Sequence, residues 1–218
     1  MRTDDLIIEL ARRASPVTPL APPAVRCARW AGAMVLLTAV GVLLLGPRAD
    51  LARALVQPAY GARLVTTLLT AALASFGAFA LSVPNAHRSP LAQILPYAAF
   101  ASWILLLTAL LFSGGEPIGR LLAFPVNWPC GYKIFGFSLI PGVVLFMLIG
   151  RAAPLQIIQN AATAALAATT LGAVATQLIC PVDDPAHQLV GHVLPVVVLA
   201  VIGLAVGYRT LERTIARF

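Results

Sequence analysis

Six apolar runs, each about as long as a bilayer-crossing helix, dominate this sequence and limit the folds open to it. A helix that crosses a membrane needs roughly 20 mostly apolar residues. Proline, glycine and charged residues separate the runs, and these residue types end helices and favour water. The pattern predicts an all-α, polytopic membrane protein with six transmembrane helices in a bundle. The expected spans are Cys27–Leu45, Leu64–Val83, Leu91–Phe112, Ile134–Gly150, Ile157–Ile179 and Leu189–Tyr208.

The composition excludes several other classes of protein. Hydrophobic residues make up 60% of the 218 residues and charged residues only 11%, whereas soluble domains carry about 25% charged residues. A soluble enzyme, a secreted disulfide scaffold and a disordered acidic chain are therefore excluded. The net charge of +7 does not indicate nucleic-acid binding, because the basic residues are scattered between the apolar runs instead of forming a patch. We expect no direct contact with nucleic acid.

The positions of the basic residues predict how the chain is oriented. Arginine and lysine are enriched in the cytoplasmic loops of membrane proteins. With six spans both termini lie on the same side, which carries ten of the fifteen basic residues; the other five are Arg48, Arg53, Arg63, Arg120 and Lys133. We therefore expect a cytoplasmic segment at 1–26, a transmembrane domain surrounded by lipid at 27–208 and a cytoplasmic tail at 209–218. Every charge is expected at a span end or in a loop, which argues against ion-coupled transport.

The N-terminal segment from Thr3 to Ala14 is predicted to be a short amphipathic helix. Its apolar residues follow the spacing of one helix face, and they are Leu6, Ile7, Leu10, Ala11 and Ala14. A helix this short is marginal in water by itself, so its apolar stripe needs a surface to cover. That surface is either the membrane or the protein's own loops, or a groove on a cytoplasmic partner. The prolines that follow favour an extended tether to the first span.

Cysteines and histidines form the second candidate site. Cys27 lies on the reducing, cytoplasmic side and is expected to be inert, whereas Cys130 and Cys180 lie on the outer side. These two thiols can form a disulfide if their Cα atoms lie within ~7 Å. With His187 and His192 they also make a two-Cys, two-His set that suits zinc, copper or cadmium. Structural cysteines and interfacial histidines are the alternatives. The neighbouring Asp183 and Asp184 are expected to add acceptors or to orient a histidine.

The chain resembles a known family along nearly its whole length. The six-span layout and several short motifs carry the resemblance together, although none is very specific alone: Arg2–Ile7, Pro16-Val17, Pro22-Pro23, Cys130, Ser138–Pro141, Gly150–Leu155, Cys180–Asp183, His187 and His192. The sequence is similar in these respects to the NrsF family of membrane anti-sigma factors. The resemblance implies a protein of the bacterial cytoplasmic (inner) membrane that negatively regulates an extracytoplasmic-function sigma factor.

The resemblance also implies roles for both candidate sites. The N-terminal segment would hold the sigma factor, with Asp4 and Asp5 meeting basic residues and Leu6, Ile7 and Leu10 filling an apolar groove. The two outer cysteines would take part in sensing. A small membrane transporter or channel is the alternative function, and a membrane enzyme is the weakest one because no GxSxG or HExxH motif is present. The stimulus, the particular sigma factor and the oligomeric state stay open.

Overall fold

The computed structural model describes residues 3–13, 19–83, 90–114 and 128–215. Every regular element in these ranges is helical: α1 (Thr3–Arg13), α2 (Pro23–Leu45), α3 (Leu51–Leu55), α4 (Pro58–Leu81), α5 (Pro90–Ser113), α7 (Trp128–Gly150), α8 (Ile157–Ile179), α9 (Pro185–Gln188), the π-helical turn η2 (Leu189–Val193) and α10 (Leu194–Ile215). The predicted all-α fold is confirmed. Pro16, which belongs to the expected tether, lies outside the described residues.

Six of the described helices are long and apolar enough to cross a membrane, which confirms the predicted number of spans. They are α2, α4, α5, α7, α8 and the continuous α9–η2–α10 segment. Several begin earlier than the apolar runs because a proline occupies the first helical turn, as Pro23, Pro58 and Pro185 do. Proline suits that position because its missing N–H would have no helical partner there. The chain is therefore a multi-pass helical membrane protein.

The expectation that every charge lies at a span end or in a loop is wrong for Arg63. Helix α4 begins at Pro58 instead of Leu64, so Arg63 lies inside it and is only 2% exposed. A charge can be buried in this way only when it is paired, and the partner of Arg63 is Asp183, from the loop between α8 and α9. Hydrophobicity alone could not reveal a partner 120 residues away along the chain.

Helix α8 occupies the centre of the bundle, where α2, α4, α7 and α10 pack against it. Its alanine- and threonine-rich sequence is almost entirely buried, as predicted for a closely packed helix. The small side chains let neighbouring helices approach: a Cβ on Gly172 would clash with Ser138 of α7. On α10, a Cβ on Gly203 would lie 2.9 Å from Ala165. These glycines therefore serve packing within the chain.

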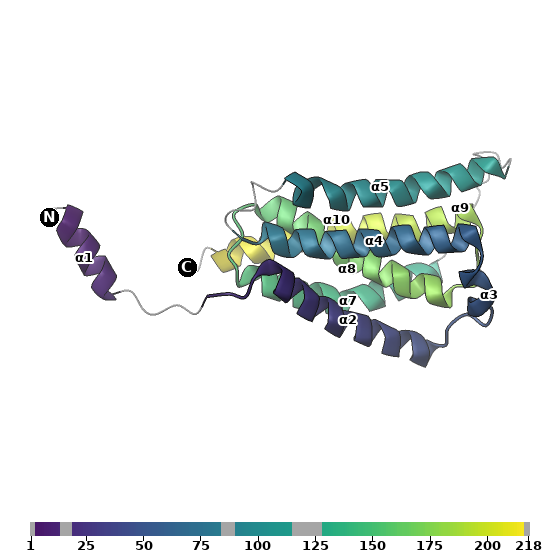
Figure 1. Cartoon of the computed structure of the whole chain (residues 1–218), viewed down its shortest axis with the longest axis horizontal. Helices are drawn as coiled ribbons and strands as arrows, with labels where there is room; N and C mark the ends of the chain where they lie inside the picture. The colour runs from purple at the N-terminus through teal and green to yellow at the C-terminus, as the bar shows by residue number, and fades with distance from the viewer. Residues whose placement is uncertain (1–2, 14–18, 84–89, 115–127, 216–218) are drawn as a thin grey trace.

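Successive long helices run in alternating directions, and this fixes which loops share an end of the bundle. The start of α2 and the end of α10 lie at one end, whereas α3 and α9 lie at the other (Figure 1). We call these the α2-start end and the α9 end. The loop from Cys180 to Asp184, which joins α8 to α9, belongs to the α9 end. The start of α2, to which the N-terminal segment leads, thus lies at the opposite end of the bundle from the Cys180–Asp184 loop.

Candidate metal and thiol site

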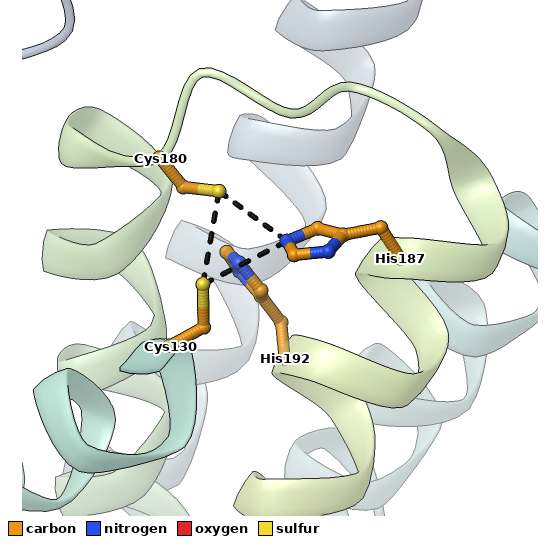
Figure 2. A group of neighbouring side chains, drawn as sticks. All are labelled: Cys130, Cys180, His187 and His192. Atoms are coloured by element: carbon orange, nitrogen blue, oxygen red, sulfur yellow. Dashed lines mark hydrogen bonds between the residues drawn. The ribbon is translucent and has the colours of Figure 1, made fainter. Parts of the chain in front are cut away.

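Two cysteines and two histidines converge at the α9 end of the bundle (Figure 2). Cys130 lies in the first turn of α7, Cys180 directly follows α8, His187 lies in α9 and His192 in η2. Their ligand atoms all lie within 4.8 Å of one another. None of the four residues is more than 4% exposed. Residues separated by up to 62 positions in the sequence thus form one buried group, which we call the Cys/His site.

A local distortion of the last span brings its two histidines together. His187 and His192 are five residues apart, a spacing that would point them to different faces of a regular α-helix. The π-helical turn Leu189–Val193 changes this register, and the two rings lie 5.4 Å apart between centroids. A π turn of this kind is rare and is found mostly at functional sites. Gly191 makes room for the His187 ring, because a Cβ at position 191 would lie 3.2 Å from that ring.

The spacing of the four groups fits a tetrahedral thiophilic metal ion. Two sulfurs bound to one Zn²⁺ lie ~3.8 Å apart, and a sulfur and a nitrogen ~3.5 Å apart, if the usual bond lengths hold. The Cys130 and Cys180 Sγ atoms are 3.8 Å apart, and His187 Nε2 lies 3.3 Å from Cys180 Sγ and 3.7 Å from Cys130 Sγ. Neither ring nitrogen of the fully buried His192 is in hydrogen-bond geometry with a described residue. A metal ion would give that imidazole a partner.

The two cysteines are free thiols in this arrangement, not a disulfide. The Cys130 thiol donates a hydrogen bond to Cys180 Sγ, and this bond, helped by the contact with His187, lowers the pKa of Cys180. The thiolate is the form that binds metals and reacts with oxidants. A disulfide would require the sulfurs to approach from 3.8 Å to ~2.05 Å. The same pair of side chains therefore suits both a thiophilic metal and an oxidant.

The segment that carries Cys180 and His187 is held in place by its own polar residues. The Asp184 side chain caps α9 by accepting hydrogen bonds from the backbone N–H groups of Ala186 and His187. The Gln188 side chain donates to the carbonyl of Val182 at 2.6 Å. Asp184, which the sequence suggested as an added acceptor or as a residue that orients a histidine, thus accepts a hydrogen bond from the backbone of His187. These bonds fix the segment that carries two of the four candidate ligands.

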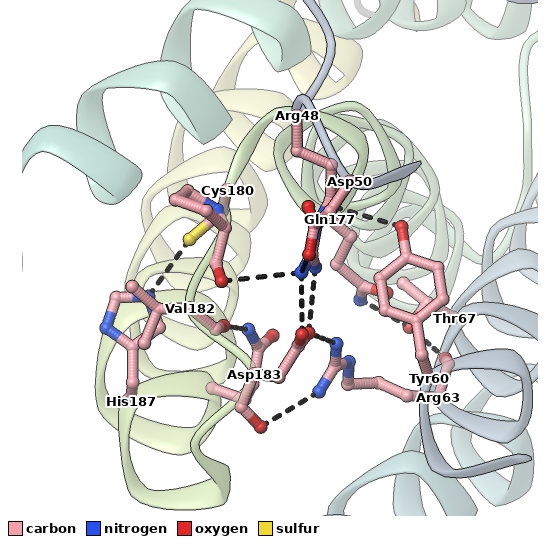
Figure 3. Close-up of polar contacts among 12 residues, drawn as sticks. Arg48, Asp50, Tyr60, Arg63, Thr67, Gln177, Cys180, Val182, Asp183 and His187 are labelled. Carbon is pink, nitrogen blue, oxygen red and sulfur yellow. Dashed lines mark hydrogen bonds and ion pairs between the residues drawn. The ribbon is translucent and has the colours of Figure 1, made fainter. Parts of the chain in front are cut away.

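A buried ion cluster supports the same segment from the side of α4 (Figure 3). The carboxylate of Asp183 accepts hydrogen bonds from Arg48 at 2.8 and 2.6 Å and from Arg63 at 2.5 Å. Both guanidinium groups also lie over the ring of Tyr60, 5.2 and 5.0 Å from its centroid. Arg48 also binds Asp50. We call these residues the arginine cluster.

The arginine cluster changes the role that the sequence suggested for Asp183. This residue neither contributes to the Cys/His site nor orients a histidine, because both of its oxygens bind arginine. The hydrogen bonds that Arg48 donates lower the pKa of Asp183, and donating them to Asp183 and Asp50 raises the pKa of Arg48 itself. The sequence analysis missed Arg48 and Arg63, which it assigned to outer loops by charge alone. The signal that could have paired them with Asp183 is that the six-span topology places all three residues on the same side of the membrane.

The N-terminal candidate residues lie on α1, far from the Cys/His site along the chain. Asp4 and Asp5 occupy its first turn, where the positive end of the helix dipole stabilises negative charges. Leu6, Ile7 and Leu10 are 41%, 59% and 60% exposed. The predicted amphipathic helix is therefore present, and its apolar stripe is uncovered in the isolated chain. Exposed apolar groups on one helix face are typical of a surface that binds a partner.

Comparison with known proteins identifies the family to which this multi-pass protein belongs. A profile of the NrsF family, described as negative regulator of sigma F, matches residues 10–212. The match covers nearly the whole chain, and the chain belongs to the NrsF family. No curated protein and no solved structure matches it. The resemblance noted in the sequence is therefore confirmed, and the protein is a negative regulator of a sigma factor by family.

Proposed function

We propose that the chain is a membrane-bound anti-sigma factor of the cytoplasmic membrane that sequesters an extracytoplasmic-function sigma factor through α1. It releases the sigma factor when a thiophilic metal or an oxidant reacts at the Cys/His site. Family membership supports the regulatory role. The observation that carries the sensing role is the convergence of two thiols and two imidazoles, all buried, from α7, the end of α8, α9 and η2.

The holding half of the function rests on α1. Both termini are cytoplasmic, so α1 is on the same side of the membrane as the transcription machinery. Its exposed Leu6, Ile7 and Leu10 enter an apolar groove of the sigma factor, and Asp4 and Asp5 meet basic residues at the rim of that groove. A sigma factor held in this way has its apolar surface covered. It therefore cannot use the same surface to bind the core of RNA polymerase.

The sensing half rests on the chemistry of the Cys/His site. A thiophilic cation such as Cd²⁺, Cu⁺ or Zn²⁺ replaces the thiol protons and takes lone pairs from two sulfurs and two imidazole nitrogens. An oxidant instead removes two electrons and two protons from Cys130 and Cys180, which join in a disulfide. Either event changes the forces between α7 and the α8–α9 segment, since these elements hold the two cysteines.

A reporter experiment with cysteine variants tests this function. The parent, Cys130→Ser, Cys180→Ser and the double variant are expressed with a promoter that the sigma factor reads, then exposed to cadmium or to an oxidant. We expect the parent to switch the promoter on and all three variants to fail. Cys27→Ser is the matched control, because Cys27 lies in α2 away from the Cys/His site, and it should respond like the parent. Normal induction of the folded double variant would contradict the proposal.

A further inference from the structure

We infer that Arg26, in the first turn of α2, is the positioning residue that passes the state of the Cys/His site to the N-terminal segment. This inference rests on the proposed function and adds the route by which the signal crosses the bundle. Arg26 lies at the α2-start end, directly after the tether, and its backbone N–H donates to the carbonyl of Pro22. A change at Arg26 is therefore a change in how the sigma-binding segment leaves the bundle.

The guanidinium of Arg26 joins the ends of two other spans. One nitrogen donates to Ser82 Oγ at the end of α4, at 3.2 Å, and the other donates to the carbonyl of Leu148 near the end of α7, at 2.5 Å. The guanidinium also lies over the ring of Phe79 of α4, 5.3 Å from its centroid. Arg26 thus depends on the relative position of α4 and α7.

The carbonyl that Arg26 binds on α7 is one that the helix leaves unpaired. In a continuous α-helix the N–H of Ala152 would donate to Leu148, but here it donates to Ile149. The last carbonyls of a helix need partners from elsewhere. Arg26 supplies that partner from a different span. The bond is therefore part of how α7 ends, and a shift of α7 along its axis would break it.

Of the two helices that meet at Arg26, α7 has its other end at the Cys/His site and α4 carries part of the arginine cluster. Helix α7 carries Cys130 in its first turn. Helix α4 carries Arg63, which binds Asp183, three residues after Cys180. Cys130 is thus connected to Arg26 through α7, and Cys180 through Asp183 and α4. A change in the distance between the two cysteines therefore shifts α7 relative to α4. Arg26 contacts both helices at the α2-start end and is sensitive to that shift.

Trp30, one turn further along α2, makes a second contact of the same kind. Its ring N–H donates to the carbonyl of Pro141 in the middle of α7, at 3.3 Å. Proline lacks an N–H, so α7 misses one helical hydrogen bond at Pro141, a place where helices bend. The Trp30 ring also packs against Phe79, with the centroids 6.2 Å apart. Helix α2 therefore contacts α7 in two places, at Pro141 and near the end of α7.

The variant Arg26→Gln tests the route, with Arg29→Gln as the matched control. Arg29 lies in the same helix, has the same charge and is exposed. In reporter cells we expect Arg26→Gln to give the same output with and without cadmium, while Arg29→Gln keeps the parent's induction. A structural defect alone is excluded by a second measurement on the purified full-length variant, in which cadmium should still bind and protect both thiols from alkylation as it does in the parent.

Two milder variants grade the result. Ser82→Ala removes the α4 half of the bridge, and Arg26→Lys keeps the charge but cannot donate a planar pair of bonds to two acceptors. Both should induce less than the parent and more than Arg26→Gln. The inference is overturned if Arg26→Gln induces like the parent. If the parent itself shows no response to cadmium or holds no sigma factor, the proposed function fails instead, so the two failures can be told apart.

Discussion

Helix α1 and the Cys/His site are constructed in opposite ways. The apolar residues of α1 are exposed, from Leu6 at 41% to Leu10 at 60%, whereas His192 is completely buried. Helix α1 is one continuous segment whose pattern can be read locally. The Cys/His site draws on α7, the end of α8, α9 and η2. Under the proposed function this difference means that α1 needs a protein surface to cover its apolar side chains, whereas the Cys/His site needs only a small ligand.

The largest expected effect comes from removing the apolar stripe of α1. The double variant Leu6→Asp, Leu10→Asp should lose binding of the sigma factor by more than a hundredfold, since burying each leucine contributes about 1.5–3 kcal/mol. The thermal stability of the bundle should not change, because both side chains are exposed. Ile8→Asp is the control, because Ile8 faces away from the stripe. Affinity and melting temperature are measured on the full-length chain in detergent, and undiminished binding by the double variant would contradict a role for α1.

A substitution in the Cys/His site should weaken the binding of metal and leave the binding of the sigma factor unchanged. His192→Asn removes one of the four candidate ligands. Loss of a residue that only hydrogen-bonds to a ligand lowers metal affinity ~10–100-fold, and loss of a ligand itself should lower the affinity for Cd²⁺ by more than that. Binding of the sigma factor in the absence of metal should stay near that of the parent. Competition with a chromophoric chelator measures the first quantity and a pull-down the second. Unchanged metal affinity would show that His192 is not a ligand.

A smaller effect is expected from the arginine cluster. Asp183→Asn leaves all four candidate ligands in place but weakens the bonds to Arg48 and Arg63 that hold the α8–α9 loop. The affinity for Cd²⁺ should fall by about tenfold, as for other residues that position ligands. The neighbouring Asp50→Asn is the control, since Asp50 binds Arg48 but not Arg63. If the two variants have equal metal affinity, the position of the loop does not depend on Asp183.

The smallest effect concerns pH. Hydrogen bonds from Arg48 hold the pKa of Asp183 below the ordinary value of 3.8. A carboxyl group with a lowered pKa stabilises the fold above its unfolded pKa, and this stabilisation is lost as the pH falls through the folded pKa. The melting temperature of the detergent-solubilised protein should therefore decline below a pH of 3.8, and less steeply in Asp183→Asn. Identical acid profiles for the two proteins would remove Asp183 from the explanation.

The sequence predicted the features that depend on local pattern. The six spans follow from apolar runs, and α1 follows from the spacing of Leu6, Ile7 and Leu10, because helix periodicity is encoded within a few turns. The grouping of Cys130 with Cys180 required only the topology, which places both at the same membrane surface. Burial of α8 was likewise evident from its small residues, since these permit close helix packing.

The features that the sequence could not predict depend on tertiary contacts. The π turn that pairs His187 with His192 leaves no signal in hydrophobic periodicity, because one extra residue in a turn shifts the register only locally. The burial of Arg63 depends on Asp183, and the bond from Arg26 to Leu148 depends on where α7 ends. A backbone carbonyl has no sequence identity, so no pattern could indicate it as the partner of an arginine.

One titration tests the central claim that the Cys/His site controls the hold of α1 on the sigma factor. The full-length protein is placed with the sigma factor bound in lipid nanodiscs, which leave both faces open to solution. Cd²⁺ is added while sulfur-to-cadmium absorbance and free sigma factor are followed together. The account predicts that both signals rise in parallel and level off at one equivalent of Cd²⁺ per chain. Absorbance that saturates while the sigma factor stays bound would contradict it.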